Sequence, residues 1–146
     1  MPVPSRNILL VEDNPDDEAL TLRALSRHNV KAQVIVVHDG QEALEWLADA
    51  AEPPALILLD LQLPKIDGLE VLRRLRANPR TALVPVVILT SSKEDRDRAG
   101  GYRGGANSYV QKPVDFAEFV DAVRQLGVYW LVLNQPPPGD ATSSLS

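Results

Sequence analysis

The chain has 146 residues, 45% hydrophobic and 24% charged, as expected for one globular domain that can bury a real core. It contains no cysteine, which excludes disulfides, thiolate metal sites and cysteine nucleophiles, and favours a reducing cytoplasm. The net charge of −5 argues against nucleic-acid binding, and neither a signal peptide nor an apolar run of the ~20 residues needed to cross a membrane is present.

Strand and helix patterns alternate from the start of the chain. Residues 7–12 are a short aliphatic run, apolar on both faces, as a central parallel strand should be. The run from Asn14 to Asp17, with capping residues, a proline and acids, then starts a helix over about 16–27 that carries Leu20, Leu22-Arg23 and Leu25 at helical spacing. Residues 33–37 form the second predicted strand, a helix follows Asp39-Gly40, and residues 55–59 form the third strand.

The second half continues the alternation with a loop, a helix, a strand, a further helix, a short strand and a last helix. These are expected at residues 63–68, 69–78, 86–89, 94–104, 108–110 and 115–133. The segment 94–104 has the right place for a fourth helix but a poor sequence for one. Gly100-Gly101 lie in its middle, and each glycine costs roughly 1 kcal/mol relative to alanine in a helix.

Five strands alternating with five helices predict an α/β fold with a doubly wound parallel sheet. The flavodoxin-like strand order 2-1-3-4-5 is the expected topology, with its switch point between the first and third strands. Residues 6–133 are predicted to form the single domain. Residues 134–146 are expected to be a proline-rich extension and a disordered tail, with no output domain after them.

Polar residues stand where the predicted hydrophobic strands end. Glu12 and Asp13 follow the first strand, Asp60 the third, Thr90 the fourth and Lys112 the fifth. Because the carboxyl ends of the strands in an open parallel sheet line the ligand-binding crevice, these side chains should converge. Three acids, a hydroxyl and a lysine in one crevice indicate a site for a divalent cation and a phosphoryl group.

Each acid has an expected role. The Asp60 carboxylate can accept a phosphoryl group and form an acyl phosphate. Glu12 and Asp13 offer hard oxygen ligands suited to Mg²⁺, and the Asp60 carboxylate and the Gln62 backbone carbonyl would complete the ligand set. The alternative for the run from Glu12 to Asn14 is that it only caps the following helix.

The cation and the hydroxyl have roles as well. Lys112 can bind a phosphoryl oxygen, or pair with Asp60 when phosphate is absent, and a cis Lys112-Pro113 peptide bond would help to aim its amine inward. Thr90 can donate its hydroxyl to the phosphate. The neighbouring hydroxyls that compete for this role are those of Ser91 and Ser92.

Four segments together resemble the receiver domain of two-component response regulators. They are residues 11–14, residues 58–64 with Asp67-Gly68, residues 89–91 and residues 105–113. The resemblance implies that Asp60 takes phosphate from a sensor histidine kinase with Mg²⁺ as cofactor, and that Lys112 binds it. It also implies that Thr90 and Tyr109 form the switch pair, in a signalling domain whose only chemistry is self-directed phosphotransfer and autodephosphorylation. Many members have Asp at Glu12 and Met at Gln62.

A narrower resemblance lies at the end of the chain. Residues 115–116 and 126–138 are similar to single-domain response regulators paired with cyanobacterial and bacterial phytochromes. It implies a homodimer through the fourth helix, fifth strand, fifth helix and carboxy-terminal extension. A phytochrome-type kinase would dock on the first helix, around Arg23 and Arg27.

Two other functions compete with this interpretation. An aspartyl-phosphate phosphohydrolase uses a similar site, but with a second Asp two residues beyond the nucleophile as general acid, and that position is Gln62. A degenerate receiver would act only as a protein-binding module. The full set of Asp60, Thr90 and Lys112 argues against it.

Overall fold

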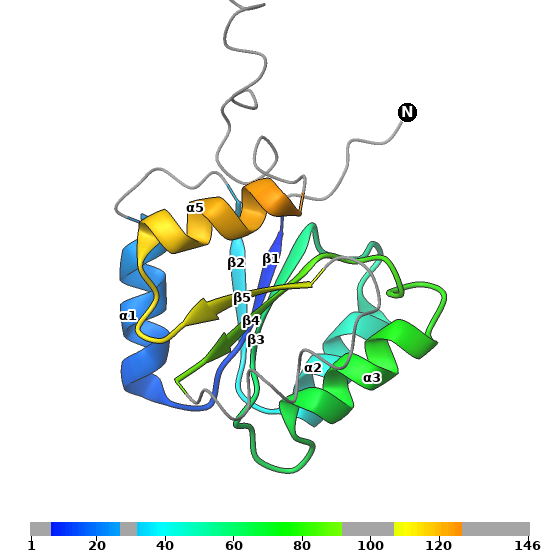
Figure 1. Ribbon diagram of the computed structural model, residues 1–146. Helices are drawn as coiled ribbons and strands as arrows, with labels where there is room; N and C mark the ends of the chain where they lie inside the picture. Colours follow the sequence, from blue (N-terminus) through cyan, green and yellow to red (C-terminus); the bar gives the residue numbers. More distant parts are fainter. Residues whose placement is uncertain (1–6, 27–31, 92–106, 127–146) are drawn as a thin grey trace, which may run out of the picture.

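The computed structural model describes residues 7–26, 32–91 and 107–126 (Figure 1). These ranges hold five strands and four helices that alternate along most of the chain. In chain order they are β1 (Ile8–Val11), α1 (Pro15–Ser26), β2 (Val34–Val37), α2 (Gly40–Asp49), β3 (Leu56–Asp60), α3 (Gly68–Ala77), β4 (Val86–Thr90), β5 (Asn107–Gln111) and α5 (Phe116–Gln125).

The strands form one parallel sheet in the order β2-β1-β3-β4-β5, which confirms the predicted topology. The register brings the carboxyl ends of the strands to one edge of the sheet. Val11 pairs with Leu59, Asp60 with Leu89, and Thr90 with Gln111. Residues placed just beyond these ends therefore meet.

Helices cover both faces of the sheet (Figure 1). On one face, α2 and α3 enclose a core that includes Leu47, Leu72 and Ile88. On the other, α1 and α5 enclose a core that includes Leu25 and Phe119. The residues of β1, β3 and β4 are all buried, because these strands are covered on both sides. Their continuous apolar runs therefore have a direct physical cause.

A short polar side chain caps the start of each described helix. Asn14 Oδ1 accepts hydrogen bonds from the backbone N–H groups of Asp16 and Asp17 at 2.8 and 3.0 Å. The aspartates that precede the other three helices each accept one from the third residue of their helix: Asp39, Asp67 and Asp115. Such caps fix where a helix starts after a strand-end loop.

Parts of the sequence prediction differ from the structure or lie outside the described residues. Asp60 and Thr90 are the last residues of their strands rather than the first residues after them. On α1, Leu20 is 44% exposed and Thr21 is buried instead. The expected fourth helix at 94–104, the remainder of the last helix and the carboxy-terminal extension all lie outside the described residues. Four of the five expected helices are therefore described, and none of these four is long and apolar enough to cross a membrane.

Candidate functional site

The Lys112 ammonium is bound by three carboxylates at the carboxyl edge of the sheet. Its Nζ donates to Glu12 Oε1 at 3.1 Å, to Asp17 Oδ2 at 2.8 Å and to Asp60 Oδ2 at 3.0 Å. These partners come from the end of β1, from α1 and from the end of β3. Glu12, Asp60 and Lys112, which were predicted to converge, do so in a buried cluster. Their side chains are 0%, 3% and 8% exposed.

Backbone hydrogen bonds hold each of these residues in place. Glu12 N–H donates to the carbonyl of Val37 at 3.0 Å, and Glu12 Oε2 accepts from Asn14 N–H at 3.1 Å. Asp60 Oδ1 accepts from Gln62 N–H at 3.0 Å, which leaves Oδ2 to Lys112. Backbone N–H groups two residues further along therefore orient the carboxyl groups of Glu12 and Asp60.

Lys112 follows β5 directly. Its N–H donates to the carbonyl of Thr90 at 3.1 Å, and the Lys112–Pro113 peptide bond is cis, which confirms the conditional prediction. The ammonium can therefore reach Asp60 across β4, because β4 lies between β3 and β5 in the sheet.

Gly68 permits α3 to start against the end of β3. Its N–H donates to the carbonyl of Leu61 at 3.1 Å. A Cβ atom at this position would lie 2.5 Å from Asp60 O and 2.5 Å from Leu61 Cα, closer than real Cβ atoms come to backbone. Only glycine therefore fits here, and its absent side chain keeps the helix start beside Asp60.

The ionisation of the cluster follows from burial and from the excess of acids. The pKa of Glu12 is raised from 4.5 to about 7, mainly by burial and also by the nearby Asp60 carboxyl. Burial alone would lower the pKa of Lys112, but hydrogen bonds to Asp17, Asp60 and Glu12 more than offset this and raise it. Lys112 is therefore a permanent cation near neutral pH, and Glu12 is a carboxyl that titrates there.

The donor set fits a hard divalent cation. Among residues 7–26, 32–91 and 107–126, no three histidine, cysteine or acidic side chains already form a metal cage. Instead Lys112 lies between the carboxyls of Glu12 and Asp60, while the predicted ligand Asp13 is exposed beside them. Mg²⁺ keeps several waters and takes only one or two carboxylates, so this arrangement suits it. Gln62 is exposed next to Asp60.

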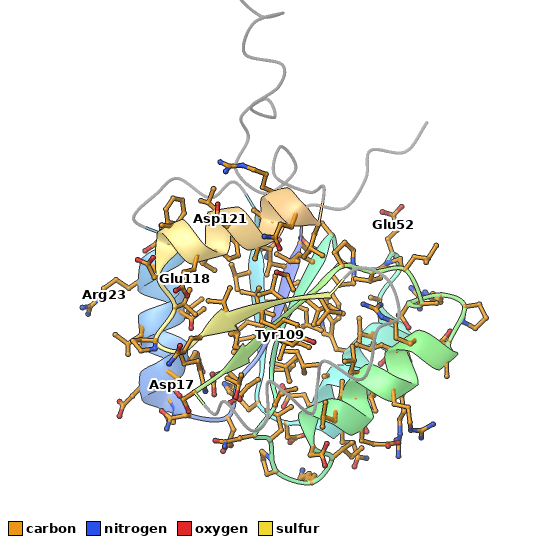
Figure 2. All side chains as sticks on the ribbon, viewed as in Figure 1. Asp17, Arg23, Glu52, Tyr109, Glu118 and Asp121 are labelled. Carbon is orange, nitrogen blue, oxygen red and sulfur yellow. The ribbon has the colours of Figure 1, made fainter. Side chains whose placement is uncertain are left out.

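Thr90 and Tyr109 lie on the same face of the sheet. Tyr109 pairs in register with Ile88 on β4, and Thr90 is the next same-face residue along β4. Thr90 is fully buried, whereas Tyr109 is half-buried against the core on the α2 and α3 face. Figure 2 shows Tyr109 on β5, the edge strand. Of the competing hydroxyls, Ser91 is exposed and Ser92 lies outside the described residues.

Asp17 is the site residue that sequence reasoning missed, because it was assigned only to the helix start. It makes the shortest of the three bonds to Lys112. Asp17 lies one helical turn before Thr21 and two before Leu25, both of which are buried against the sheet. The stripe 17-21-25 therefore faces inward and brings Asp17 to Lys112. Figure 2 labels Asp17 on the first part of α1. The sequence does contain a signal for this contact, because Asp17, Thr21 and Leu25 are each four residues apart and so share one face of the helix. The predicted stripe of leucines left out Asp17 and Thr21.

Known proteins are similar to this chain in sequence. Residues 8–124 match the response regulator receiver domain. The chain is 38% identical to the probable methanogenesis regulatory protein FilR2 of Methanothrix harundinacea, over 89% of this chain and 86% of that protein. It is 35% identical to the response regulator Rcp1 of Synechocystis, over 88% of this chain and 90% of Rcp1.

Solved structures of bacteriophytochrome response regulators are also similar. RtBRR has 48% identity and a TM-score of 0.80, covering 95% of this chain and 88% of that one. AtBRR has 45% identity and a TM-score of 0.83, covering 91% and 100%. Similar structures include the phosphorylated cyanobacterial phytochrome response regulator RcpA and Mn²⁺-bound Rcp1, each 34% identical. The chain belongs to the response regulator receiver domain family and is closely similar in structure to bacteriophytochrome response regulators.

Proposed function

We propose that this chain accepts a phosphoryl group on Asp60 from a sensor histidine kinase, in Mg²⁺-dependent two-component signal transduction. The observation that carries the proposal is the Asp60 carboxylate, 3% exposed and bound at 3.0 Å to the Lys112 ammonium at the carboxyl edge of the sheet. A buried carboxylate with one cationic partner is suited to receive a phosphoryl group whose negative oxygens that partner can bind.

The transfer forms one bond and breaks one. An Asp60 carboxylate oxygen attacks phosphorus of a phosphohistidine, an O–P bond forms, and the N–P bond breaks. A phosphoimidazole that already carries a proton on its other ring nitrogen leaves as neutral imidazole. Lys112 stabilises the charge on the transferring phosphoryl oxygens, and the Thr90 hydroxyl, at the end of β4, donates to one of them.

Glu12, Asp13, Asp60 and the Gln62 backbone carbonyl would hold the Mg²⁺ ion. The bound cation supplies positive charge that offsets repulsion between Asp60 and the incoming phosphate. Support comes from the acidic oxygen donors gathered at this edge and from the metal named in the Rcp1 structure. Glu12, with its raised pKa of about 7, would release its proton as the metal binds.

Signal output is proposed to run from Thr90 to Tyr109. Phosphate would draw the Thr90 hydroxyl toward Asp60 and open space into which the Tyr109 ring turns. The support is their position on one face of β4 and β5, with Tyr109 half-buried on the edge strand. A near-complete switch needs about 5.5 kcal/mol of differential stabilisation.

The kinase partner is proposed to be of the phytochrome type, docking around Arg23, which is exposed on α1 (Figure 2), and Arg27. The edge position of β5 supports a homodimer that also uses α5, the fourth helix and the extension. We assign residues 6–133 to the receiver and 134–146 to the extension and tail, with a cytoplasmic location. DNA binding is not part of the proposal, since the chain carries a net charge of −5.

The phosphohydrolase alternative lacks its general acid. Gln62, two residues beyond Asp60, carries an amide that cannot give up a proton to a leaving group. Glu12 has the raised pKa of an acid catalyst, but it is fully buried and bonded to Lys112 and Asn14. The site is therefore better suited to taking a phosphoryl group than to releasing product repeatedly.

The test is labelling with acetyl phosphate and Mg²⁺, read by intact mass. We expect wild type to gain the mass of one phosphoryl group, and Asp60→Asn to gain none. Asp67→Asn is the matched control, because Asp67 is an exposed acid that caps α3 and does not touch Lys112. Labelling of Asp60→Asn at the wild-type level would place the acceptor elsewhere and refute the proposal.

A further inference from the structure

We infer that Asp17 is a positioning residue for phosphotransfer, which holds the Lys112 ammonium in place before and after Asp60 is phosphorylated. The inference rests on the proposed function of Asp60 as the acceptor. Asp17 Oδ2 lies 2.8 Å from Lys112 Nζ, and this is the shortest of the three bonds that the ammonium makes.

The packing and the cap of α1 fix the direction from which Asp17 contacts Lys112. Asp17 shares the inward stripe of α1 with the buried Thr21 and Leu25, and its N–H is bound by the Asn14 cap at 3.0 Å. The adjacent Asp16 is exposed and is not part of the Lys112 cluster. The helix packing therefore selects one of two neighbouring aspartates for the contact.

Asp17 differs from the other two partners in exposure. Its side chain is 30% exposed, whereas those of Glu12 and Asp60 are 0% and 3% exposed. Asp17 therefore lies on the solvent side of Lys112, and the other two carboxyls lie on the buried side. An ammonium has three N–H donors, and the three bonds use all of them.

Binding of metal and phosphate would change the hydrogen bonds of Lys112 to its buried partners, Glu12 and Asp60, but not its bond to Asp17. Glu12 and Asp60 are both proposed metal ligands, and Asp60 is the acceptor, so their oxygens are needed elsewhere once the site is loaded. Asp17 has no proposed role in binding metal or phosphate. It can keep accepting from Lys112 while the other donors turn to the phosphoryl oxygens. A long lysine side chain that loses this contact regains rotamer freedom and is less often in position.

The effect should separate maximal rate from donor affinity. Asp17→Asn removes a charge-assisted bond, and we expect the maximal rate of phosphorylation by acetyl phosphate with Mg²⁺ to fall about tenfold. The half-saturating acetyl phosphate concentration should not rise, because a negative charge is lost near an anionic donor. Asp16→Asn is the matched control: it removes the same charge one residue away and should keep the maximal rate within twofold of wild type. Asp17→Glu, with solvent space for its extra methylene, should recover most of the rate.

A spectroscopic measurement tests the contact without any phosphotransfer. In wild type and Asp16→Asn, the ¹⁵N signal of the Lys112 ammonium should show slow proton exchange, because all three donors are bonded. In Asp17→Asn the exchange should be at least several-fold faster, with the far-UV circular dichroism unchanged. Unchanged Lys112 exchange in Asp17→Asn, or a maximal rate within twofold of wild type, would overturn the inference. If wild type itself takes no label on Asp60, the proposed function fails, while the exchange measurement still decides whether Asp17 holds Lys112.

Discussion

Replacing Glu12 with glutamine should change how the stability of the fold depends on pH. Glu12 is fully buried, and its carboxyl lies near that of Asp60, so ionising it is costly. Its pKa rises from 4.5 to about 7 as a result. Glutamine has nearly the same shape and can still accept a hydrogen bond from Lys112, but it carries no charge at any pH.

The sign follows from proton binding. Between pH 4.5 and about 7 the folded chain keeps a proton on Glu12 that the unfolded chain has already released. The contribution of this group to the free energy of unfolding therefore falls as the pH rises through that window, and is lowest above pH 7. At about 1.4 kcal/mol for each pH unit, the rise corresponds to about 3 kcal/mol. The free energy of unfolding of Glu12→Gln should lack this part of the pH dependence.

Urea unfolding at pH 5 and pH 8.5, with a chelator to remove metal, measures the effect. The free energy of unfolding of Glu12→Gln minus that of wild type should increase by about 2 to 3 kcal/mol from the lower to the higher pH, because the unfolded chain has already released most of this proton at pH 5. Titrating groups that do not interact with Glu12 cancel in this difference. Glu52→Gln is the control, because Glu52 is an exposed carboxyl on the connection between α2 and β3 (Figure 2). A Glu12→Gln difference that is the same at both pH values would refute the raised pKa.

Three further variants probe the packing and switching of the same domain. Gly68→Ala places a Cβ atom 2.5 Å from Asp60 O, so we expect a loss of about 2 kcal/mol in urea unfolding and slower labelling of Asp60 by acetyl phosphate. Arg80→Ala removes a guanidinium that donates to three carbonyls at the end of α2, and should cost about 1 kcal/mol while labelling stays within twofold of wild type. Thr90→Ala should abolish the response of the Tyr109 ring signals to phosphorylation in NMR spectra; a ring that still responds would contradict the coupling.

The strands and much of the site could be predicted from the sequence because few physical alternatives exist. A run such as that of β3, apolar at its first four positions and only a few residues long, fits a strand covered on both faces. Parallel strands place their carboxyl ends at one edge, so Glu12, Asp60 and Lys112 had to approach one another. These predictions needed topology alone.

The rotation of α1 about its own axis could not be predicted in the same way. The leucines suggested one inward stripe, and the structure confirms it at Leu25, which is buried, but it also buries Thr21 and leaves Leu20 44% exposed. The rotation of a helix beside a charged cluster depends both on which apolar side chains it buries and on which polar contacts its first turn makes. The sequence does not show which of these two contributions is larger. The error in the stripe and the failure to assign Asp17 to the site therefore have one cause.

On the proposed function, the three bonds of Lys112 link one small ligand at Asp60 to several elements of the fold. The ammonium joins the ends of β1 and β3 to α1 and to β5, and its buried charge is fully compensated only while those bonds persist. A cation or phosphoryl group that binds the Asp60 oxygens would have to replace the hydrogen bond that Lys112 makes to Asp60. Its binding would therefore change the contacts of all these elements together. Lys112 directly follows β5, the edge strand of the described sheet, on which Tyr109 is half-buried. The strand that leads into the proposed phosphate-binding cation therefore also carries the proposed output residue, three residues before it.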